Sequence, residues 1–315
     1  MSKINKDIVN KAAIDTNALQ SGGILLPEQA KKFLKQTMEA TPLTKLVRHE
    51  MRISRKGELD KIGVAGRITR KKTEGSDNGY RAGVAFDKVE YSTVAVRLPW
   101  ETTEESLREN IEGESMEQII TDLMTAQLGI DLEDLCLNAD VDTASTDPDY
   151  EFLSITDGWL KKLKNGAHVV DRSSVNSGAL GLDVFYEGSR AVPSKYHNGK
   201  LRWLLSPNMR SYWEQYILTQ AATAGGIVTD KRVENPGAIP CVEVPRMPDD
   251  CIVLTDPLNL IIVNTYTVKI RKTTEGKEAV MEDKRFYVVH LDFDAIIEEL
   301  DAAAIIIGLD PESGL

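Results

Sequence analysis

Cysteine is scarce in this chain of 315 residues, which has only three: Cys136, Cys241 and Cys251. They form no Cys-x-x-Cys pair, so the spacing excludes a disulfide framework and a four-cysteine zinc site, and we expect three small buried side chains. No apolar run approaches the roughly 20 residues that cross a bilayer. The first residues also lack the apolar core of a secretory signal. These absences predict a protein made in the cytosol that makes no use of a membrane.

Motifs for catalysis and ligand binding are also missing. The sequence contains no GxSxG elbow, no GxxxxGK[ST] phosphate loop and no GxGxxG fingerprint. Its four histidines, His49, His168, His197 and His290, are far apart and show no metal-ligand spacing. Residues 147–151 (DPDYE) loosely resemble a calcium loop but lack its central glycine and terminal glutamate at the right offsets. We therefore expect no enzyme activity, no metal and no cofactor.

Positive charge is in the minority, because 38 Lys and Arg face 49 Asp and Glu, for a net charge of −11. This balance argues against a general nucleic-acid-binding protein, which needs clustered basic side chains to neutralise phosphates. Basic residues do cluster at 67–72, 161–164 and 269–272. We interpret these clusters as solvated faces or contacts between subunits, in preference to sites for a polyanion.

The most informative segment that is present runs from about residue 48 to 100. Alternation of side chains predicts two strands, at 47–53 and 84–98, on either side of a polar, glycine-containing tip. Such a hairpin has almost nothing to bury and is not stable alone in water. We expect it to lie on another copy of the chain. The tip residues predicted to make that contact are Arg70, Lys71, Lys72, Glu74, Asp77 and Tyr80.

The remaining sequence mixes helices and strands. Apolar residues recur every four positions from Met116 to Leu132, which predicts one long amphipathic helix over residues 114–138, with an acidic opposite face at Asp131, Glu133 and Asp134. Shorter helices are expected at 158–163, 182–192 and 209–220, and strands at 201–205, 251–255, 259–271 and 285–293. Residues 295–300 fit helix or strand equally well. The elements lack regular βαβ spacing, so the predicted class is α+β.

The order of these segments, with several short motifs, resembles the major capsid proteins of tailed bacteriophages, which have the Hong Kong 97 capsid fold. The resemblance covers nearly the whole chain and is weak at each motif alone. The motifs are residues 23–30 (GILLPEQA), 41–43 (TPL), 57–62 (GELDKI), 94–99 (VAVRLP) before Glu104 and Glu105, and 131–140 (DLEDLCLNAD).

The resemblance implies a division of the chain into parts. Residues 1–45 would be an N-terminal arm, 46–100 an extended loop, and 101–180 a peripheral domain whose spine is the long helix. Residues 181–255 would form an axial domain, and 256–315 would supply strands that return to both domains. The implied function is self-assembly through hexamers and pentamers into an icosahedral shell around double-stranded DNA. The implied location is the virion capsid, assembled in the cytoplasm of a host bacterium.

The same resemblance raises further expectations and leaves alternatives. Only about 22 residues precede Gly23, so we expect a separate scaffold protein, together with a portal. Lys71 and Lys72 lie at the loop tip, but no matching Asn and Glu can be assigned, so we expect no covalent crosslinks between subunits. One alternative is an encapsulin, a bacterial nanocompartment of the same fold that encloses a cargo enzyme. The other is a soluble α+β enzyme of unknown activity.

Overall fold

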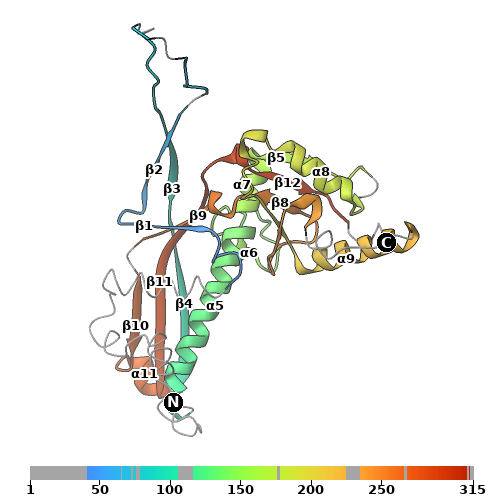
Figure 1. Cartoon of the computed structure of the whole chain (residues 1–315). Helices are drawn as coiled ribbons and strands as arrows, with labels where there is room; N and C mark the ends of the chain where they lie inside the picture. The colour runs from blue at the N-terminus through green and yellow to red at the C-terminus, as the bar shows by residue number, and fades with distance from the viewer. Residues whose placement is uncertain are drawn as a thin grey trace, which may run out of the picture.

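The computed structural model describes residues 41–64, 66–71, 74–75, 79–105, 116–175, 178–224, 235–265, 268–310 and 312. The molecule is elongated, with a two-stranded projection at one end, a long sheet beside a long helix, and a second mixed region to one side (Figure 1). Residues 1–40, most of the expected N-terminal arm, lie outside the described residues. Within them, no helix combines the length and the apolar character that crossing a membrane would require.

The first sheet has five strands and is organised around its longest one, β11 (Lys284–Ile297). The first part of β11 pairs antiparallel with β10 (Lys269–Thr273) and with β4 (Val94–Thr103). Its last residues pair antiparallel with β9 (Leu260–Thr265), which also pairs in parallel with β1 (Arg48–Arg52). Residues 295–297 therefore continue a strand, which decides between the two options that the sequence left open.

The long helix α5 (Met116–Asn138) confirms that these residues form one long helix. Its second half is the buried part: Leu128 and Leu132 pack against the face of the first sheet that carries Val289 and Leu291. Near its beginning, Leu123 is 64% exposed, so the apolar stripe continues beyond what this copy covers.

The predicted acidic face of α5 is wrong at one position. Glu133 is 1% exposed and accepts a hydrogen bond from the backbone N–H of Thr44 at 3.2 Å. A buried carboxylate needs such a partner, and here it comes from a segment 89 residues away. Asp131 and Asp134 are half-buried at the helix side.

The second sheet has the order β5-β12-β8-β6-β7 and lies to the side of α5. Its strands are β5 (His168–Asp171), β6 (Arg202–Leu205), β7 (Cys241–Glu243), β8 (Ile252–Thr255) and β12 (Ala304–Ile307). Helices α7 (Trp159–Gly166), α8 (Leu182–Ala191) and α9 (Pro207–Ala224) pack around it. The predicted strands at 201–205 and 251–255 are confirmed.

Two apolar clusters hold this region together. One side of the second sheet packs Trp203 against Phe185 of α8 and Trp213 of α9, with edge-on ring contacts at centroid distances of 5.1 and 4.7 Å from Phe185. The other side packs on α7 and is continuous with the core under the first sheet. Phe185, Trp203 and Trp213 are therefore core residues.

Helix α9 begins as predicted and ends later than expected. The backbone N–H of Met209 donates to Ser206 Oγ at 3.0 Å, and Pro207 occupies the first turn. The helix continues through Ala224, four residues beyond the predicted end at residue 220. Alanine has the highest helix propensity, which explains the extension.

Short elements complete the fold. They are α6 (Tyr150–Leu153), α11 (Lys277–Glu282), and four 3₁₀ turns, η3 (Ser194–Tyr196), η4 (Pro236–Ala238), η5 (Pro257–Asn259) and η6 (Leu300–Ala302). The turns η5 and η6 lie on two short connections between the first and second sheets, from β8 to β9 and from β11 to β12.

Candidate assembly surface: the β2–β3 hairpin

The projection is a hairpin of β2 (Lys56–Gly63) and β3 (Ala85–Ser92), which form a two-stranded sheet of their own (Figure 1). Their antiparallel register runs from Lys56 opposite Ser92 to Gly63 opposite Ala85. The hairpin is thus shorter than the sequence indicated. The predicted strand at 47–53 is β1, which pairs with β9, and the end of the predicted strand at 84–98 belongs to β4, which pairs with β11.

Apolar side chains fix the base of the hairpin to the body of the same copy. Leu59 and Tyr91 are each 6% exposed and pack with Val89 against Ile261 and Val263 of β9. Along β3, Val89 and Tyr91 alternate with Phe86, Lys88 and Glu90. Val89 and Tyr91 therefore face the protein, and Phe86, Lys88 and Glu90 face outward.

Polar contacts hold the hairpin base from both strands. The backbone N–H of Ser92 donates to Asp294 Oδ2 at 2.8 Å, and Lys162 Nζ lies 3.2 Å from the other oxygen of Asp294. The backbone N–H of Thr93 donates to the carbonyl of Arg55 at 2.8 Å. Because Asp294 is 5% exposed and bonded on both oxygens, it fixes the end of β3 to the body.

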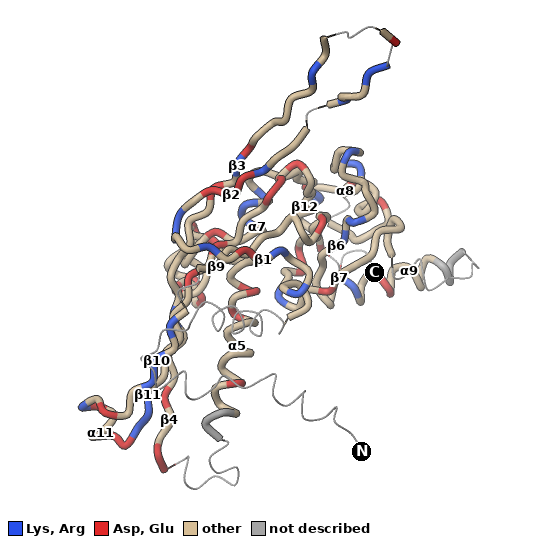
Figure 2. Tube along the Cα trace, turned by 60° about the vertical axis from the view of Figure 1, so that its left-hand side comes forward, with Lys and Arg blue, Asp and Glu red and all other residues tan. Residues whose placement is uncertain are grey.

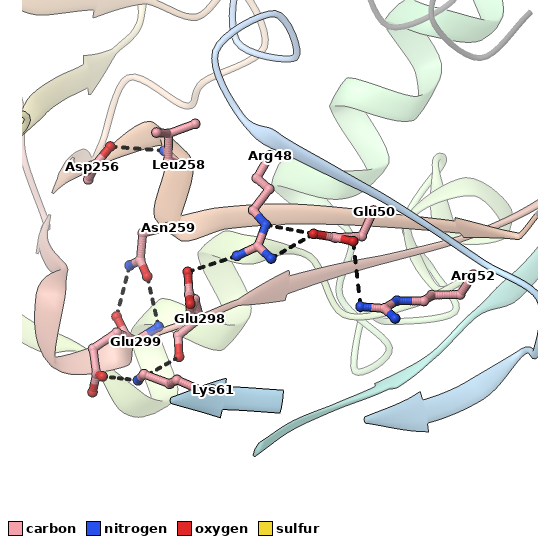
Figure 3. Close-up of polar contacts among 9 residues, drawn as sticks. All are labelled: Arg48, Glu50, Arg52, Lys61, Asp256, Leu258, Asn259, Glu298 and Glu299. Atoms are coloured by element: carbon pink, nitrogen blue, oxygen red, sulfur yellow. Dashed lines mark hydrogen bonds and ion pairs between the residues drawn. The ribbon is translucent and has the colours of Figure 1, made fainter. Parts of the chain in front are cut away.

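A second group of polar contacts joins the hairpin to the junction between the two sheets (Figure 3). Lys61 of β2 forms an ion pair with Glu299, beside η6. The Asn259 side chain of η5 forms two hydrogen bonds with the backbone of Glu299: it accepts from the N–H at 2.8 Å and donates to the carbonyl at 2.9 Å. Next to it, Arg48 Nη1 lies 3.3 Å from Glu298 Oε2. The hairpin is therefore connected to the segments that link the sheets.

Beyond this base, the hairpin presents apolar side chains to solvent. Ile62 and Phe86 are directly opposite each other in the register and are 69% and 78% exposed. Further exposed apolar residues toward the tip are Val64, Ile68, Tyr80 and Val84. Six exposed apolar side chains on one projection are typical of a surface that another molecule covers. Sequence reasoning did not single out Ile62 and Phe86 as contact residues.

The predicted tip residues Arg70, Lys71, Glu74 and Tyr80 are all exposed. The Arg70 guanidinium lies 4.4 Å from the centroid of the Tyr80 ring, so the structure brings these two together across the tip. Lys72 and Asp77 lie outside the described residues. By sequence, residues 64–84 contain five basic and two acidic side chains, so this segment carries +3 in a chain whose net charge is −11.

The described part of the chain has few side chains placed for metal binding or nucleophilic catalysis. It contains no group of three or more His, Cys, Asp or Glu side chains placed to hold a metal ion. Burial raises the pKa of the Cys241 thiol to about 11 and that of Cys251 to about 12, and it also raises the pKa of Cys136. His49 Nε2 and the backbone carbonyl of Thr44 are 2.6 Å apart, and His197 Nε2 lies 3.1 Å from the Val192 carbonyl. Both histidines therefore hydrogen-bond to the backbone five residues before them in the chain, which is a structural role.

Comparison with known proteins gives one clear sequence relative. A Bacillus subtilis (strain 168) protein, provisionally named as the prophage capsid protein YqbE, is 26% identical over an alignment that covers 96% of this chain and 98% of that protein. No protein-family model matches the chain.

Solved structures agree on the fold. A chain of the satellite phage P4 procapsid, which includes the size determination protein Sid, matches with a TM-score of 0.70 and 16% identity, covering 98% of both chains. An encapsulin of Synechococcus elongatus PCC 7942 matches with a TM-score of 0.56 and 11% identity, covering 87% of this chain and 89% of the encapsulin chain. These likenesses show a shared fold, and the expected Hong Kong 97 capsid fold is confirmed. The sequence relative that is named as a prophage capsid protein and the fold shared with phage capsid chains together support the resemblance of this chain to phage major capsid proteins.

Proposed function

We propose that copies of this protein associate as hexamers and pentamers and close into an icosahedral shell around double-stranded DNA. In this shell the distal part of each hairpin lies on a neighbouring copy. Contacts between different surfaces of identical subunits generate closed rings, which are the units that such a shell requires. The role is structural, and no catalytic step is part of it.

The observation that carries the proposal is the contrast between the two ends of the hairpin. Its base is fixed to the body by Leu59, Tyr91 and Asp294, whereas Ile62 and Phe86, only a few residues farther out, are exposed. A strand pair with a fixed base and an uncovered apolar end is built to project toward a partner. Covering Ile62 and Phe86 contributes about 1.5–3 kcal/mol for each side chain that becomes fully buried.

The predicted parts map onto the fold as follows, and their names remain part of the proposal. The first sheet with α5 corresponds to the peripheral domain, and the second sheet with α8 and α9 to the axial domain. The strand β5, from the segment assigned by sequence to the peripheral domain, pairs with β12 in the second sheet. Contacts around fivefold and sixfold axes would then involve the region of α8 and α9.

The partners follow from the same proposal. The shell would assemble in the cytoplasm of a host bacterium on a separate scaffold protein, with a portal at one vertex, and would become the virion capsid. The acidic chain suits a wall that confines DNA without adhering to it, because like charges repel. No sequence-specific DNA contact is part of the proposal.

The test is to replace both exposed residues in the variant Ile62→Ser/Phe86→Ser. Since neither side chain is buried in one copy, the unfolding midpoint of the subunit should remain unchanged, while the yield of sedimenting particles should fall by at least about tenfold, the factor for about 1.4 kcal/mol lost per contact. Electron microscopy identifies the particles. Val280→Ser serves as the control, because Val280 on α11 is 67% exposed and α11 lies at the end of the first sheet that is far from the hairpin (Figure 1).

Normal shells from the double variant would contradict the proposed role of the hairpin. Persistence of the wild-type protein as a small oligomer, alone and with its neighbouring gene products, would contradict the capsid function itself. Particles that enclose a cargo enzyme and lack nucleic acid and portal would show an encapsulin.

A further inference from the structure

A row of basic side chains lies across the face of the first sheet that points away from α5. The strand register places Arg97 of β4 opposite His290 of β11, and His290 opposite Lys269 of β10. Arg271 is two residues farther along β10 and therefore projects on the same face. Figure 2 shows basic residues along β10 and β11.

None of these four side chains has a hydrogen bond or ion pair within the part of the chain that the structure describes. Other cations of the same region are paired: Lys284 with Glu101 at 3.0 Å and Arg55 with Asp292 at 2.9 Å. In a chain with an excess of 11 acidic groups, the three unpaired cations Arg97, Lys269 and Arg271 are a local exception that an external anion would neutralise.

The face is also hollowed where these residues lie. A cavity of about 430 Å³ is lined by Arg55, Ala95, Lys269, Arg271, His290 and Asp292. It adjoins a second cavity of 600 Å³ through the shared Arg271, and apolar Pro99, Phe286 and Val288 line that second part. We call the two cavities with Arg97 the basic groove. It suits an occupant with several carboxylates and some apolar surface.

One exposed segment of the chain has that composition. Residues 139–158 contain six acidic side chains and no Lys or Arg. We call this segment the acidic loop. Asp140 and Asp142 are bonded to Lys161, at 2.8 and 2.6 Å, and this Lys161 contact holds the pKa of Asp140 below its usual range.

Three carboxylates of the acidic loop remain available. Asp147, Asp149 and Glu151 are exposed, and no Lys or Arg of the described chain pairs with them. Beside them, Val141 and Tyr150 are 53% and 38% exposed, which adds apolar surface. The loop thus offers three carboxylates without an ion pair in the described chain for Arg97, Lys269 and Arg271, although Asp147 Oδ1 also accepts from the backbone N–H of Asp149 at 2.9 Å.

Within one copy the two surfaces do not meet. The loop follows the last residue of α5, whereas the groove lies on the sheet face that α5 does not cover (Figure 1). We infer that the basic groove of one copy binds the acidic loop of a second copy. This inference rests on the proposed self-assembly and identifies a second contact in it, separate from the hairpin. The contact joins two different surfaces, as closed rings require.

The experiment reverses the charges on each side and then on both. The groove variant is Arg97→Glu/Lys269→Glu/Arg271→Glu, and the loop variant is Asp147→Lys/Asp149→Lys/Glu151→Lys. Each alone should lower the yield of sedimenting particles by at least about tenfold through charge repulsion, a loss of about 1.4 kcal/mol. The chain that carries all six substitutions should recover most of the wild-type yield. Lys164→Glu/Lys200→Glu/Lys277→Glu makes the same change in net charge as the groove variant at exposed positions elsewhere and should leave the yield high.

Circular dichroism and thermal unfolding establish that each variant folds before its assembly is scored. Recovery in the six-fold variant supports the inference, because neither misfolding nor loss of a polyanion site is repaired by reversing a distant loop. Failure of the folded six-fold variant to recover would overturn it, as would normal yields from both triple variants. Normal shells with reduced DNA content from the groove variant would instead assign the groove to nucleic acid. If the wild-type protein itself forms no particles, the proposed function fails. That result is distinguishable from a failure of the groove–loop contact, which requires wild-type particles for comparison.

Discussion

Gly57 of β2 lies opposite Tyr91 of β3, and a Cβ atom added to Gly57 would come within 2.7 Å of Tyr91 Oη and within 3.1 Å of its ring. The absence of a side chain at position 57 is what lets the Tyr91 ring lie flat over β2. Because the Tyr91 ring packs against β9, Gly57 also determines how the hairpin packs on β9.

Replacing Gly57 with valine should therefore loosen the hairpin base. We expect a loss of about 2 kcal/mol in the free energy of unfolding, because the ring must move and its packing is overfilled. Amide hydrogen exchange at β2 and β3 should accelerate. Gly63→Val is the matched control, since nothing lies within 4 Å of its added Cβ. Equal effects of the two substitutions would contradict the account of Gly57.

Two anchors of the hairpin base should differ in strength. Leu59→Ala removes a side chain that is 6% exposed and should cost about 3 kcal/mol, by lost transfer energy and a cavity. Lys61→Met breaks the ion pair between Lys61 and Glu299. Because these two side chains are 24% and 31% exposed, the loss in the free energy of unfolding should be less than about 1 kcal/mol. Urea unfolding measures both. A larger loss from Lys61→Met would mean that the ionic anchor dominates.

Arg172 at the end of β5 is 2% exposed and joins α8 through Asp183 at 2.5 Å and Glu187 at 2.8 Å. Arg172→Leu should lower the free energy of unfolding by about 2 kcal/mol, below the 3–5 typical of breaking a buried pair, because both carboxylates are about half exposed and can turn to water. Thermal unfolding tests this. Arg190→Leu, at an exposed arginine of the same helix, should change stability by less than about 0.5 kcal/mol.

The three cysteines should be unreactive in the folded protein. Because burial raises the pKa of Cys241 to about 11 and that of Cys251 to about 12, little thiolate exists at pH 8, and Cys136 is fully buried with a raised pKa as well. A thiol reagent at pH 8 should label none of them in minutes, and all of them in urea. Rapid labelling of Cys241, the half-buried one, would show that its strand edge opens.

The long helix, the class of fold and the family could be predicted from the sequence, because they depend on periodicity and on the order of segments. The partner of each strand could not. The segment at 47–53 alternates like a hairpin arm, but its β1 pairs in parallel with β9, about 210 residues later, and no local signal reports that pairing. The six-residue helix α11 was also missed, since a single turn and a half has too few positions to show a period.

In the assembly surface, the position of the hairpin was predicted better than its contact residues. The tip was chosen for its charge, and four of its six residues lie exposed in the described chain, with their role still a prediction. Ile62 and Phe86 were overlooked because an apolar residue in an alternating strand is normally assigned to the core. Likewise, Glu133 was placed on a solvated face, since nothing in its own helix reveals the Thr44 backbone that it binds.

The central position of β11 has a consequence for the order of events during synthesis. Strands β4, β9 and β10 are all made before β11, yet each pairs with it, and β4 is separated from it by about 180 residues. Contacts so distant in sequence form slowly and late. The first sheet cannot close until residue 297 has left the ribosome, so a nascent chain cannot present a finished hairpin base. Only a complete subunit is then competent to join another.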